Sequence, residues 1–292
     1  MWLARAGDNE VHSRVKTILS IQSQVAGARV GNSVAAFAME RLGVRVLQLP
    51  TTLLGRRPDH GPPGGGAVPG ETLAALFDGL AADGLLGEID AVLTGYLGAA
   101  DHVAVILDAV QRIKALNAKA IFVCDPVLGD DGKLFVSKEI ADAVVHGLWQ
   151  HADWLLPNLF ELGFITGRTV DSLASARDAA KRIGKPVLCS SIRTALGVGN
   201  LLAAPTDDWF CETARLPRAP KGTGDLLTAL FTARRVRGDA PAIALEGATG
   251  SVYDVIVRSM AADSEDLLLP AAQDVLVDPV TWPRARHLEL AG

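Results

Sequence analysis

Short apolar runs alternate with longer segments of helical period along most of this sequence, and this alternation limits the possible folds more than any other feature. We predict strands at residues 17–22, 44–49, 91–96, 120–125, 154–158, 187–191 and 201–204. We predict helices between them, most clearly at residues 31–42, 71–83, 101–116, 172–183, 225–236 and 240–261. Strands and helices that alternate in this way form a mostly parallel sheet with crossover helices.

The predicted strands are apolar throughout, which indicates that both faces of the sheet are buried under helices. Hydrophobic residues make up 49% of the chain and charged residues 21%, enough for a large core and too little charge for a disordered chain. No internal repeat divides the 292 residues. We therefore predict one α/β domain, a three-layer αβα sandwich, preceded by a polar extension over residues 1–16.

The charge and cysteine content narrow the range of partners. The net charge is -5 and the pI is about 5.7, and lysines and arginines are dispersed, so we expect no nucleic acid partner. The three cysteines form no CxxC pair, which argues against zinc and against a disulfide framework. No apolar run approaches the ~20 residues of a membrane span, and the first residues are too polar for a signal peptide, so we expect no membrane association and a cytoplasmic location.

One segment interrupts the alternation of strands and helices. Residues 55–70 contain six glycines and four prolines, and we predict that they form neither a regular helix nor a strand. Two interpretations stay open. The segment is either a surface loop or a flap that closes over a binding site, because long loops in compact domains are often functional.

Polar side chains lie where the predicted strands end. In open α/β sheets, ligands bind at the carboxyl ends of the strands, where the loops leave the sheet. The polar or small residues at these ends are Gln22, Ser23, Gly95, Tyr96, Asp125, Asn158, Ser190 and Ser191. The sequence therefore predicts that a binding site lies along this edge.

The sequence Gly-Thr-Gly-Asp at residues 222–225 precedes a predicted helix. Glycines two apart allow a sharp turn with exposed N–H groups, and the positive end of the helix dipole adds to their attraction for an anion. Phosphoryl transfer needs such donors together with a group that accepts the proton of the acceptor hydroxyl. Gly222, Thr223 and Gly224 would supply the donors and Asp225 the base. An ordinary loop with an aspartate N-cap is the alternative.

Carboxylates follow two further strands. In "CDPVLGDDG", Asp125 ends a strand, a proline turns the chain and Asp130 follows. Such carboxylates can hold Mg²⁺ through its water ligands. In "PNLFE", Asn158 and Glu161 are three residues apart and share one face of a first helical turn. Each group alone is also typical of a turn or cap, but their common position at strand ends favours one shared site.

These motifs resemble the ribokinase superfamily and, within it, the pyridoxal kinases. The Gly-Thr-Gly-Asp motif is similar to the anion hole and catalytic aspartate of the superfamily, which makes Asp225 the base. The stretch "ILSIQSQVAGARVGNS" is similar to the opening of pyridoxal kinases and implies that Ser23 hydrogen-bonds the pyridine ring. "LTGYLG" places Tyr96 in the substrate pocket, and "DPVLGD" and "PNLFE" resemble the metal-linked segments of the family.

The resemblance implies a ribokinase-like fold and phosphorylation of the 5′-hydroxymethyl group of pyridoxal, and of pyridoxine or pyridoxamine, by Mg²⁺-ATP. It implies that Asp125, Asp130 and Glu161 organise the metal. It also implies nucleotide binding by Ser190, Asn158 and Gly222, and a homodimer, and it leaves a monovalent cation requirement open.

The flap segment departs from the pattern of the family. Relatives read close to "SNHxxYG", whereas this chain has "GRRPDHG" with Arg57 and His60. Two alternatives therefore stay open. One is a related kinase that acts on hydroxymethylpyrimidine or a small sugar, and the other is a homologue that binds a vitamin B6 vitamer without turning it over.

Overall fold

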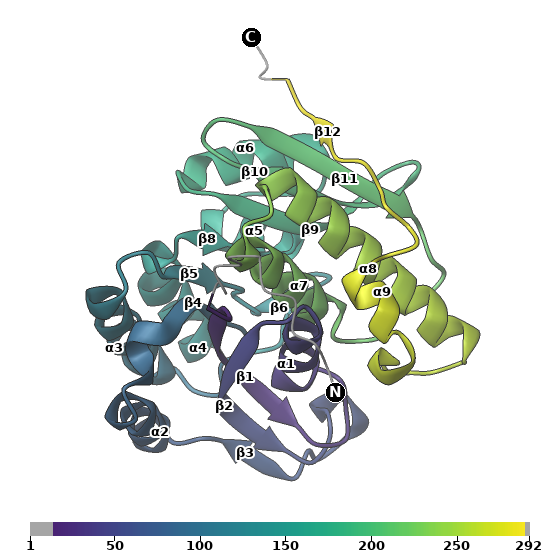
Figure 1. The fold of residues 1–292 in the computed structure, drawn as a ribbon. Coiled ribbons are helices and arrows are strands. Elements are labelled where there is room, and N and C mark those ends of the chain that lie inside the picture. Colours follow the sequence, from purple (N-terminus) through teal and green to yellow (C-terminus); the bar gives the residue numbers. More distant parts are fainter. Residues whose placement is uncertain (1–13, 290–292) are drawn as a thin grey trace, which may run out of the picture.

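The computed structural model describes residues 14–289, and over that range one sheet of ten strands runs through the whole molecule (Figure 1). Its strand order is β12-β11-β10-β9-β8-β5-β4-β1-β2-β3. The central strands pair in parallel, and they are β1 (Thr17–Val25), β2 (Arg45–Leu54), β4 (Ile89–Thr94), β5 (Ile121–Cys124), β8 (Trp154–Leu155) and β9 (Val187–Arg193). The predicted mostly parallel sheet is confirmed.

The two edges of the sheet are antiparallel. The antiparallel strands are β3 (Gly65–Ala67), β10 (Gly197–Ala203), β11 (Asp208–Ala214) and β12 (Arg286–His287). The strand predicted at residues 201–204 is part of β10. It runs against β9 because only the residues between Arg193 and Gly197 join the two strands, which is enough for a hairpin but not for a crossover.

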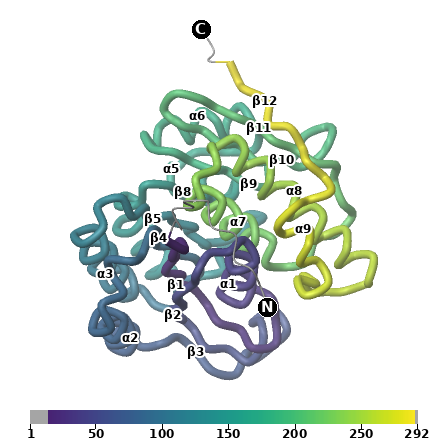
Figure 2. Tube along the Cα trace, in the orientation of Figure 1, coloured from purple at the N-terminus to yellow at the C-terminus, as the bar shows by residue number. Residues whose placement is uncertain are grey.

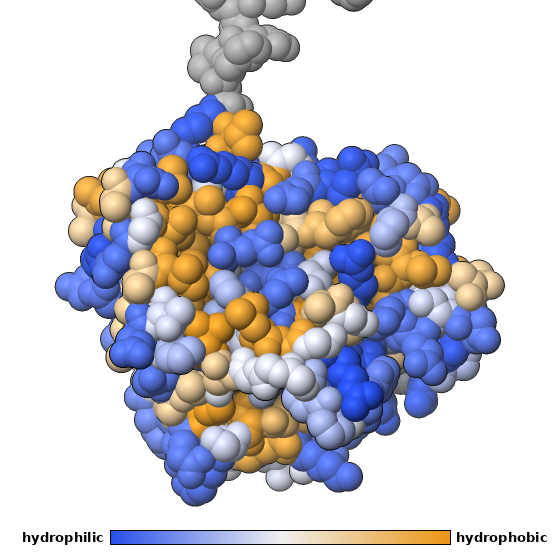
Figure 3. Space-filling model, turned by 90° about the horizontal axis from the view of Figure 1, so that it is seen from below, coloured by the Kyte–Doolittle hydropathy of each residue, from blue (hydrophilic) through white to orange (hydrophobic). Residues whose placement is uncertain are grey.

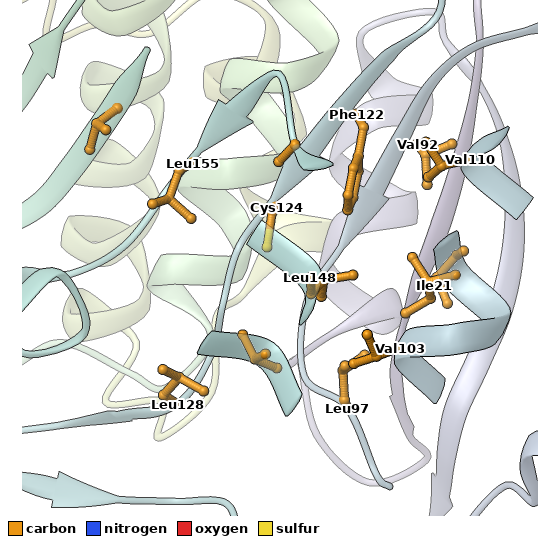
Figure 4. Packing of buried hydrophobic residues seen from close by; sticks show 14 of the residues in the cluster. Ile21, Val92, Leu97, Val103, Val110, Phe122, Cys124, Leu128, Leu148 and Leu155 are labelled. Carbon is orange, nitrogen blue, oxygen red and sulfur yellow. The ribbon is translucent and has the colours of Figure 1, made fainter. Parts of the chain in front are cut away.

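Helices cover both faces of the sheet and complete three layers. One face carries α1 (Asn32–Arg41), α7 (Thr223–Arg237), α8 (Pro241–Ala261) and α9 (Gln273–Val277), and the other carries α2 (Gly70–Ala82), α3 (His102–Leu116), α4 (Lys138–Ala143), α5 (Leu159–Thr166) and α6 (Leu173–Ile183). Successive side chains of a strand point to opposite faces, so the buried Ile18 packs under the first group and the buried Leu19 under the second. Figure 4 shows the second core, where Phe122 and Cys124 of β5 lie near Val92 and Ile21.

The six predicted helices begin and end within two residues of α1, α2, α3, α6, α7 and α8. Several short elements were not predicted from the sequence. These are α4, α9, the edge strands β3, β11 and β12, and the hairpin of β6 (Gly129–Asp130) and β7 (Lys133–Leu134). Of α5, only the first turn, at Asn158 to Glu161, was predicted. The tube in Figure 2 shows α1 and α7 side by side, and the two helices are in contact.

The prediction for residues 55–70 is wrong in one respect. Pro58–His60 form a single 3-10 turn, but Gly65–Ala67 pair with the end of β2 as the edge strand β3. An edge strand needs a partner on one side only, so a glycine-rich segment can fill this position. A side chain at Gly65 is excluded because a Cβ atom there would lie 2.0 Å from the Leu53 carbonyl oxygen, and φ is +89°. We call residues 55–70 the flap segment below.

The beginning of the chain also differs from the prediction. β1 continues through a register shift between Gln22 and Gln24 and ends at Val25, so Ser23 lies within the strand and not after it. Of the predicted extension, residues 1–13 lie outside the described part, and Arg14 forms an ion pair with Asp90 at 2.8 Å. Among residues 14–289, no helix is both long and apolar enough to cross a membrane.

Candidate active site

All the predicted site residues line two adjoining cavities on the side of the sheet where the parallel strands end. Hydrophilic residues gather in the middle of this side, with hydrophobic residues around them (Figure 3). The carboxylate cavity, of about 330 Å³, is lined by Asp125, Asp130, Asn158, Glu161, Ser190, Thr223 and Gly224. The flap cavity, of about 360 Å³, is lined by Ser23, Tyr96, Arg57 and Asp59. Gly222 and Asp225 line both cavities and form their common wall.

Gly222 precedes the first residue of α7 and fixes the backbone of the Gly-Thr-Gly-Asp loop. It is the N-cap of the helix with φ 91°, and its carbonyl oxygen accepts a hydrogen bond from the Leu226 N–H at 2.9 Å. A Cβ atom at this position would lie 2.3 Å from the Arg29 carbonyl oxygen, so only glycine fits. The first N–H groups of α7 are therefore part of the common wall, at the positive end of the helix dipole.

The Asp225 carboxylate is held from the other end of the chain. Its Oδ2 accepts a hydrogen bond from the Gly31 N–H at 2.9 Å. Gly31 has φ 56°, and a Cβ atom there would lie 2.3 Å from both the carbonyl oxygen and the Oγ of Ser23. Burial raises the pKa of Asp225, and the Gly31 N–H opposes this shift. A fixed carboxylate of raised pKa suits a general base.

A buried polar network fixes the turn that contains Gly31. The Ser20 hydroxyl donates to Asn32 Oδ1 at 2.7 Å, and Gln22 Nε2 donates to the Ser20 Oγ at 2.8 Å. Asn32 Nδ2 in turn donates to the Gln22 carbonyl oxygen at 3.1 Å. These three side chains are at most 2% exposed. Their hydrogen bonds join the "ILSIQS" stretch to the "VGN" stretch. In the sequence, the asparagine of "VGN" is the one sign of this contact.

Asp125 is a buried carboxylate held by a residue of α7. It is 8% exposed, and the Thr228 hydroxyl lies 2.8 Å from its Oδ2. Burial raises its pKa well above the ordinary range, and the negative charges of Glu161 and Asp225 raise it further. Carboxylates that oppose one another's ionisation in this way favour a cation between them. Thr228, one turn after Asp225, was not predicted from the sequence.

The turn after Asp125 is strained. Val127 has φ 39°, which is rare for a β-branched residue, and its side chain lines both cavities. The chain then enters the β6 and β7 hairpin, where the exposed Asp130 accepts a hydrogen bond from the Asp131 N–H at 2.9 Å. Strain of this kind persists where the surrounding structure fixes the backbone.

Glu161 joins the start of α5 to the turn after Asp125 through its carboxylate. Oε2 accepts from the Asn158 N–H at 2.9 Å, and Asn158 Oδ1 accepts from the Glu161 N–H, so the two residues form a capping box at the start of α5. Oε1 accepts from the Leu128 N–H at 2.8 Å. Burial raises the pKa of Glu161 to about 7, against these N–H donors.

The donor set of the carboxylate cavity suits Mg²⁺. No group of three or more His, Cys, Asp or Glu side chains within the described range is arranged to bind a metal directly. Asp125, Asp130 and Glu161 nevertheless line one cavity, and burial, followed by the negative charges of Glu161 and Asp225, raises the pKa of Asp125. Mg²⁺ prefers oxygen ligands and keeps several of its waters, so it does not need a closed cage of side chains. The residues present therefore fit a hydrated magnesium ion.

The flap cavity combines buried strand residues with the flap segment. Ser23 is 6% exposed, and burial raises the pKa of Tyr96. Across from them, Arg57 pairs with Asp59 at 3.0 Å and with Asp266 at 3.4 Å. The Asp59 partner raises the pKa of Arg57, and Arg57 lowers that of Asp59. Arg57, Pro58 and Asp59 of the flap segment thus line one side of the cavity, and an ion pair links Arg57 to the loop after α8.

A third cavity, of about 190 Å³, extends from the carboxylate cavity. The two share Ser190, Ser191, Thr223, Gly224 and Leu227. The rest of its wall comes from β10, β11 and α8, with Asn200, Thr213, Thr249, Val252, Tyr253 and Ile256. Of this cavity, the sequence predicted Ser190, Ser191, Thr223 and Gly224, and its other residues belong to no recognisable motif.

Comparison with known proteins agrees with this geometry. The family model of phosphomethylpyrimidine kinase matches residues 52–268. Pyridoxal kinase PdxY of Leifsonia xyli subsp. xyli is 37% identical over 271 residues, which cover 90% of this chain and 96% of the relative. Pyridoxal kinase PdxY of Pseudomonas fluorescens strain SBW25 is 36% identical over 288 residues, covering 95% and 99% respectively.

Among solved structures, the pyridoxal kinase of Leishmania donovani in complex with ADP and pyridoxamine superposes with a TM-score of 0.89 at 28% identity. The match covers 94% of this chain and 100% of that one. The fold and the site together define a phosphotransferase of the ribokinase-like superfamily. Within that superfamily, the chain belongs to the pyridoxal kinase family.

Proposed function

We propose that this enzyme transfers the γ-phosphoryl group of ATP to the 5′-hydroxymethyl group of pyridoxal, and of pyridoxine or pyridoxamine. The observation that carries the proposal is the common wall of the two main cavities, where Asp225 and Gly222 face both. A wall of this kind places a proton acceptor and an anion hole between two bound reactants. A relative of this chain has been crystallised with ADP and pyridoxamine.

The flap cavity would hold the vitamer, with Ser23 and Tyr96 on the pyridine ring. The carboxylate cavity would hold the phosphates, with Asn158 and Ser190 along them, and the third cavity would hold the base of the nucleotide. Asp225 would accept the proton of the 5′-hydroxyl group on Oδ1, because the Gly31 N–H holds Oδ2. The Gly222, Thr223 and Gly224 amides would stabilise the charge that develops on the transferred group.

Asp125, Asp130 and Glu161 would hold Mg²⁺, directly or through its waters. The ion would neutralise part of the charge on the nucleotide phosphates. Without it, Asp125, Glu161 and Asp225 repel the nucleotide. A monovalent cation requirement, a homodimer, a cytoplasmic location and the single-domain organisation remain predictions.

Phosphorylation of hydroxymethylpyrimidine is the second candidate. The match to the phosphomethylpyrimidine kinase model favours it, because that match includes the flap segment and the Gly-Thr-Gly-Asp loop. Both acceptors are flat nitrogen heterocycles with a hydroxymethyl group. Only the lining of the flap cavity would distinguish them.

The test is ADP release by the purified protein with Mg²⁺-ATP and, in parallel, pyridoxal, pyridoxine, hydroxymethylpyrimidine and ribose. We expect turnover with pyridoxal and a loss of roughly 10²–10⁴-fold in the Asp225→Asn variant, with ATP binding almost unchanged. Turnover with hydroxymethylpyrimidine alone would favour the second candidate. Wild-type turnover in Asp225→Asn would contradict the role of the base.

A further inference from the structure

Lys221 is the one cationic side chain among the residues that line the carboxylate cavity. The same wall contains the carboxylates of Asp125, Asp130, Glu161 and Asp225. Lys221 also lines the flap cavity and a neighbouring cavity under the flap segment. It therefore stands where the two proposed reactants meet, in a carboxylate cavity whose other charged lining residues are acidic.

Neighbouring cations are already committed to carboxylates. Arg57 pairs with Asp59 and Asp266, and Arg218 pairs with Asp263 at 2.5 Å. For Lys221, by contrast, the described residues offer no ion pair and no hydrogen bond to the ammonium group. The Lys221 Nζ lies 6.0 Å from the centroid of the Phe135 ring, a contact that holds a cation weakly.

The position of Lys221 is set by the loop that follows it. It directly precedes Gly222, whose backbone is fixed against the Arg29 carbonyl oxygen. The ring of Phe135, 54% exposed, lines both main cavities, so an ammonium beside this ring is at their junction. The flexible stem of a lysine lets such a group move without moving the backbone.

We propose that Lys221 is a catalytic residue that binds the phosphoryl group during transfer and remains on it in the phosphate monoester product. The proposal deepens the proposed function and rests on it. The bond between the γ-phosphorus and the β,γ-bridging oxygen breaks, and a bond from the 5′-oxygen to the same phosphorus forms. The hydroxyl proton goes to Asp225, and Lys221 stays protonated throughout. A mobile cation follows the moving charge, which the fixed amides of the anion hole do not.

The test compares Lys221→Met, Lys221→Arg and the control Lys133→Met, an exposed lysine on β7 outside these cavities. We expect Lys221→Met to lower kcat/KM for pyridoxal roughly tenfold to a hundredfold and to weaken binding of pyridoxal 5′-phosphate, with pyridoxal binding and the Tm unchanged. Lys221→Arg should recover part of the loss because it keeps the charge. Unchanged kcat/KM and product binding in Lys221→Met would overturn the proposal.

A second measurement separates this proposal from the identity of the acceptor. Binding of the nonhydrolysable ATP analogue AMP-PNP and of AMP is measured with Mg²⁺ for the same variants. We expect Lys221→Met to weaken AMP-PNP about tenfold and AMP not at all, since only the former has a γ-phosphate. That result would support Lys221 even if the wild-type protein fails to phosphorylate pyridoxal. Equal effects on both nucleotides would count against it.

Discussion

The carboxylate cavity and the flap cavity share a wall but are built in different ways. Around the first, Asp125 and Glu161 are at most 8% exposed, and each is bound by groups from other segments of the chain. The flap segment contributes Arg57, Pro58 and Asp59 to the second, and Arg57 pairs with the half-exposed Asp59 and with Asp266 on another loop. The first cavity depends on buried hydrogen bonds and the second on ion pairs near water.

In the proposed function, this difference separates the transfer chemistry from the choice of the substrate that receives the phosphoryl group. Leaving a buried hydrogen-bond acceptor or donor unpaired costs about 1–3 kcal/mol, so we expect the geometry of the carboxylate cavity to resist substitution. An exposed ion pair contributes only about 0–1 kcal/mol, so the flap segment can change at little cost. The sequence "GRRPDHG", which departs from the family pattern, belongs to the flap cavity, whereas the Gly-Thr-Gly-Asp loop is retained.

The largest effect is expected from a change at the common wall, because it should disturb both cavities. In Gly31→Ala the new Cβ atom would lie 2.3 Å from the Ser23 Oγ, and it would displace the N–H that holds Asp225. We expect turnover to fall at least tenfold and the free energy of unfolding to drop by about 1–3 kcal/mol, measured by ADP release and urea unfolding.

Gly43→Ala is the matched control for Gly31→Ala. Gly43 also has a positive φ, 77°, but nothing lies within 4 Å of an added Cβ atom. It should lose some stability through backbone strain and keep its turnover. Equal loss of turnover in the two variants would show that the contact with Ser23 is not what positions Asp225.

A second experiment tests the burial of Glu161 in the carboxylate cavity through the pH dependence of stability. Burial raises the pKa of Glu161 from 4.5 to about 7, so between these values the folded state binds more protons than the unfolded state. The free energy of unfolding should therefore fall as pH rises from about 4.5 to about 7, with a slope of at most about 1.4 kcal/mol per pH unit from this group.

Urea unfolding of the wild type and of Glu161→Gln at several pH values from 5 to 7.5 measures this slope. The variant should be less stable at pH 5 because the amide nitrogen of glutamine accepts no hydrogen bond, so either the Asn158 or the Leu128 N–H loses its acceptor, and this deficit should shrink as pH rises. Glu71→Gln, at an exposed position in the first turn of α2, is the control and should follow the wild type. Parallel curves for wild type and Glu161→Gln would contradict the raised pKa.

The smallest effect is expected on the flap side. Arg57→Ala removes the link to Asp266 and the pair with Asp59, so the flap segment should cover the vitamer less tightly. We expect a change of a few-fold in KM for pyridoxal, no change in KM for ATP and a loss of stability of about 1 kcal/mol or less. Arg182→Ala, which breaks an exposed pair on α6, is the control. A large fall in kcat would show that the flap segment takes part in the chemistry.

The sequence predicted the layers of the fold and the grouping of the site residues because both follow from local patterns. Apolar strands, helical periods and motifs at strand ends can each be recognised within a short segment of the sequence. What it could not predict are contacts between distant segments. Gly31 on Asp225, Thr228 on Asp125 and the network of Asn32 join residues whose neighbourhood only the folded chain creates.

The missed elements have the same origin. β3 forms because the flap segment folds back onto the free edge of β2, which outweighs the poor strand propensity of its glycines. The third cavity is formed by β10, β11 and α8 together, and none of them carries a motif. Propensity and motif describe each segment alone, whereas these features belong to pairs of segments.

The hydrogen bond between Gly31 and Asp225 spans 194 residues of the chain. Contacts of such long sequence separation form late, because the entropy of a large loop must be lost before the contact stabilises the chain. A chain that emerges from the ribosome N-terminus first completes β1 and α1 long before α7 exists. The proposed proton acceptor therefore reaches its place only when nearly the whole protein has been synthesised, and we expect a nascent or truncated chain that ends before α7 to hold no working site.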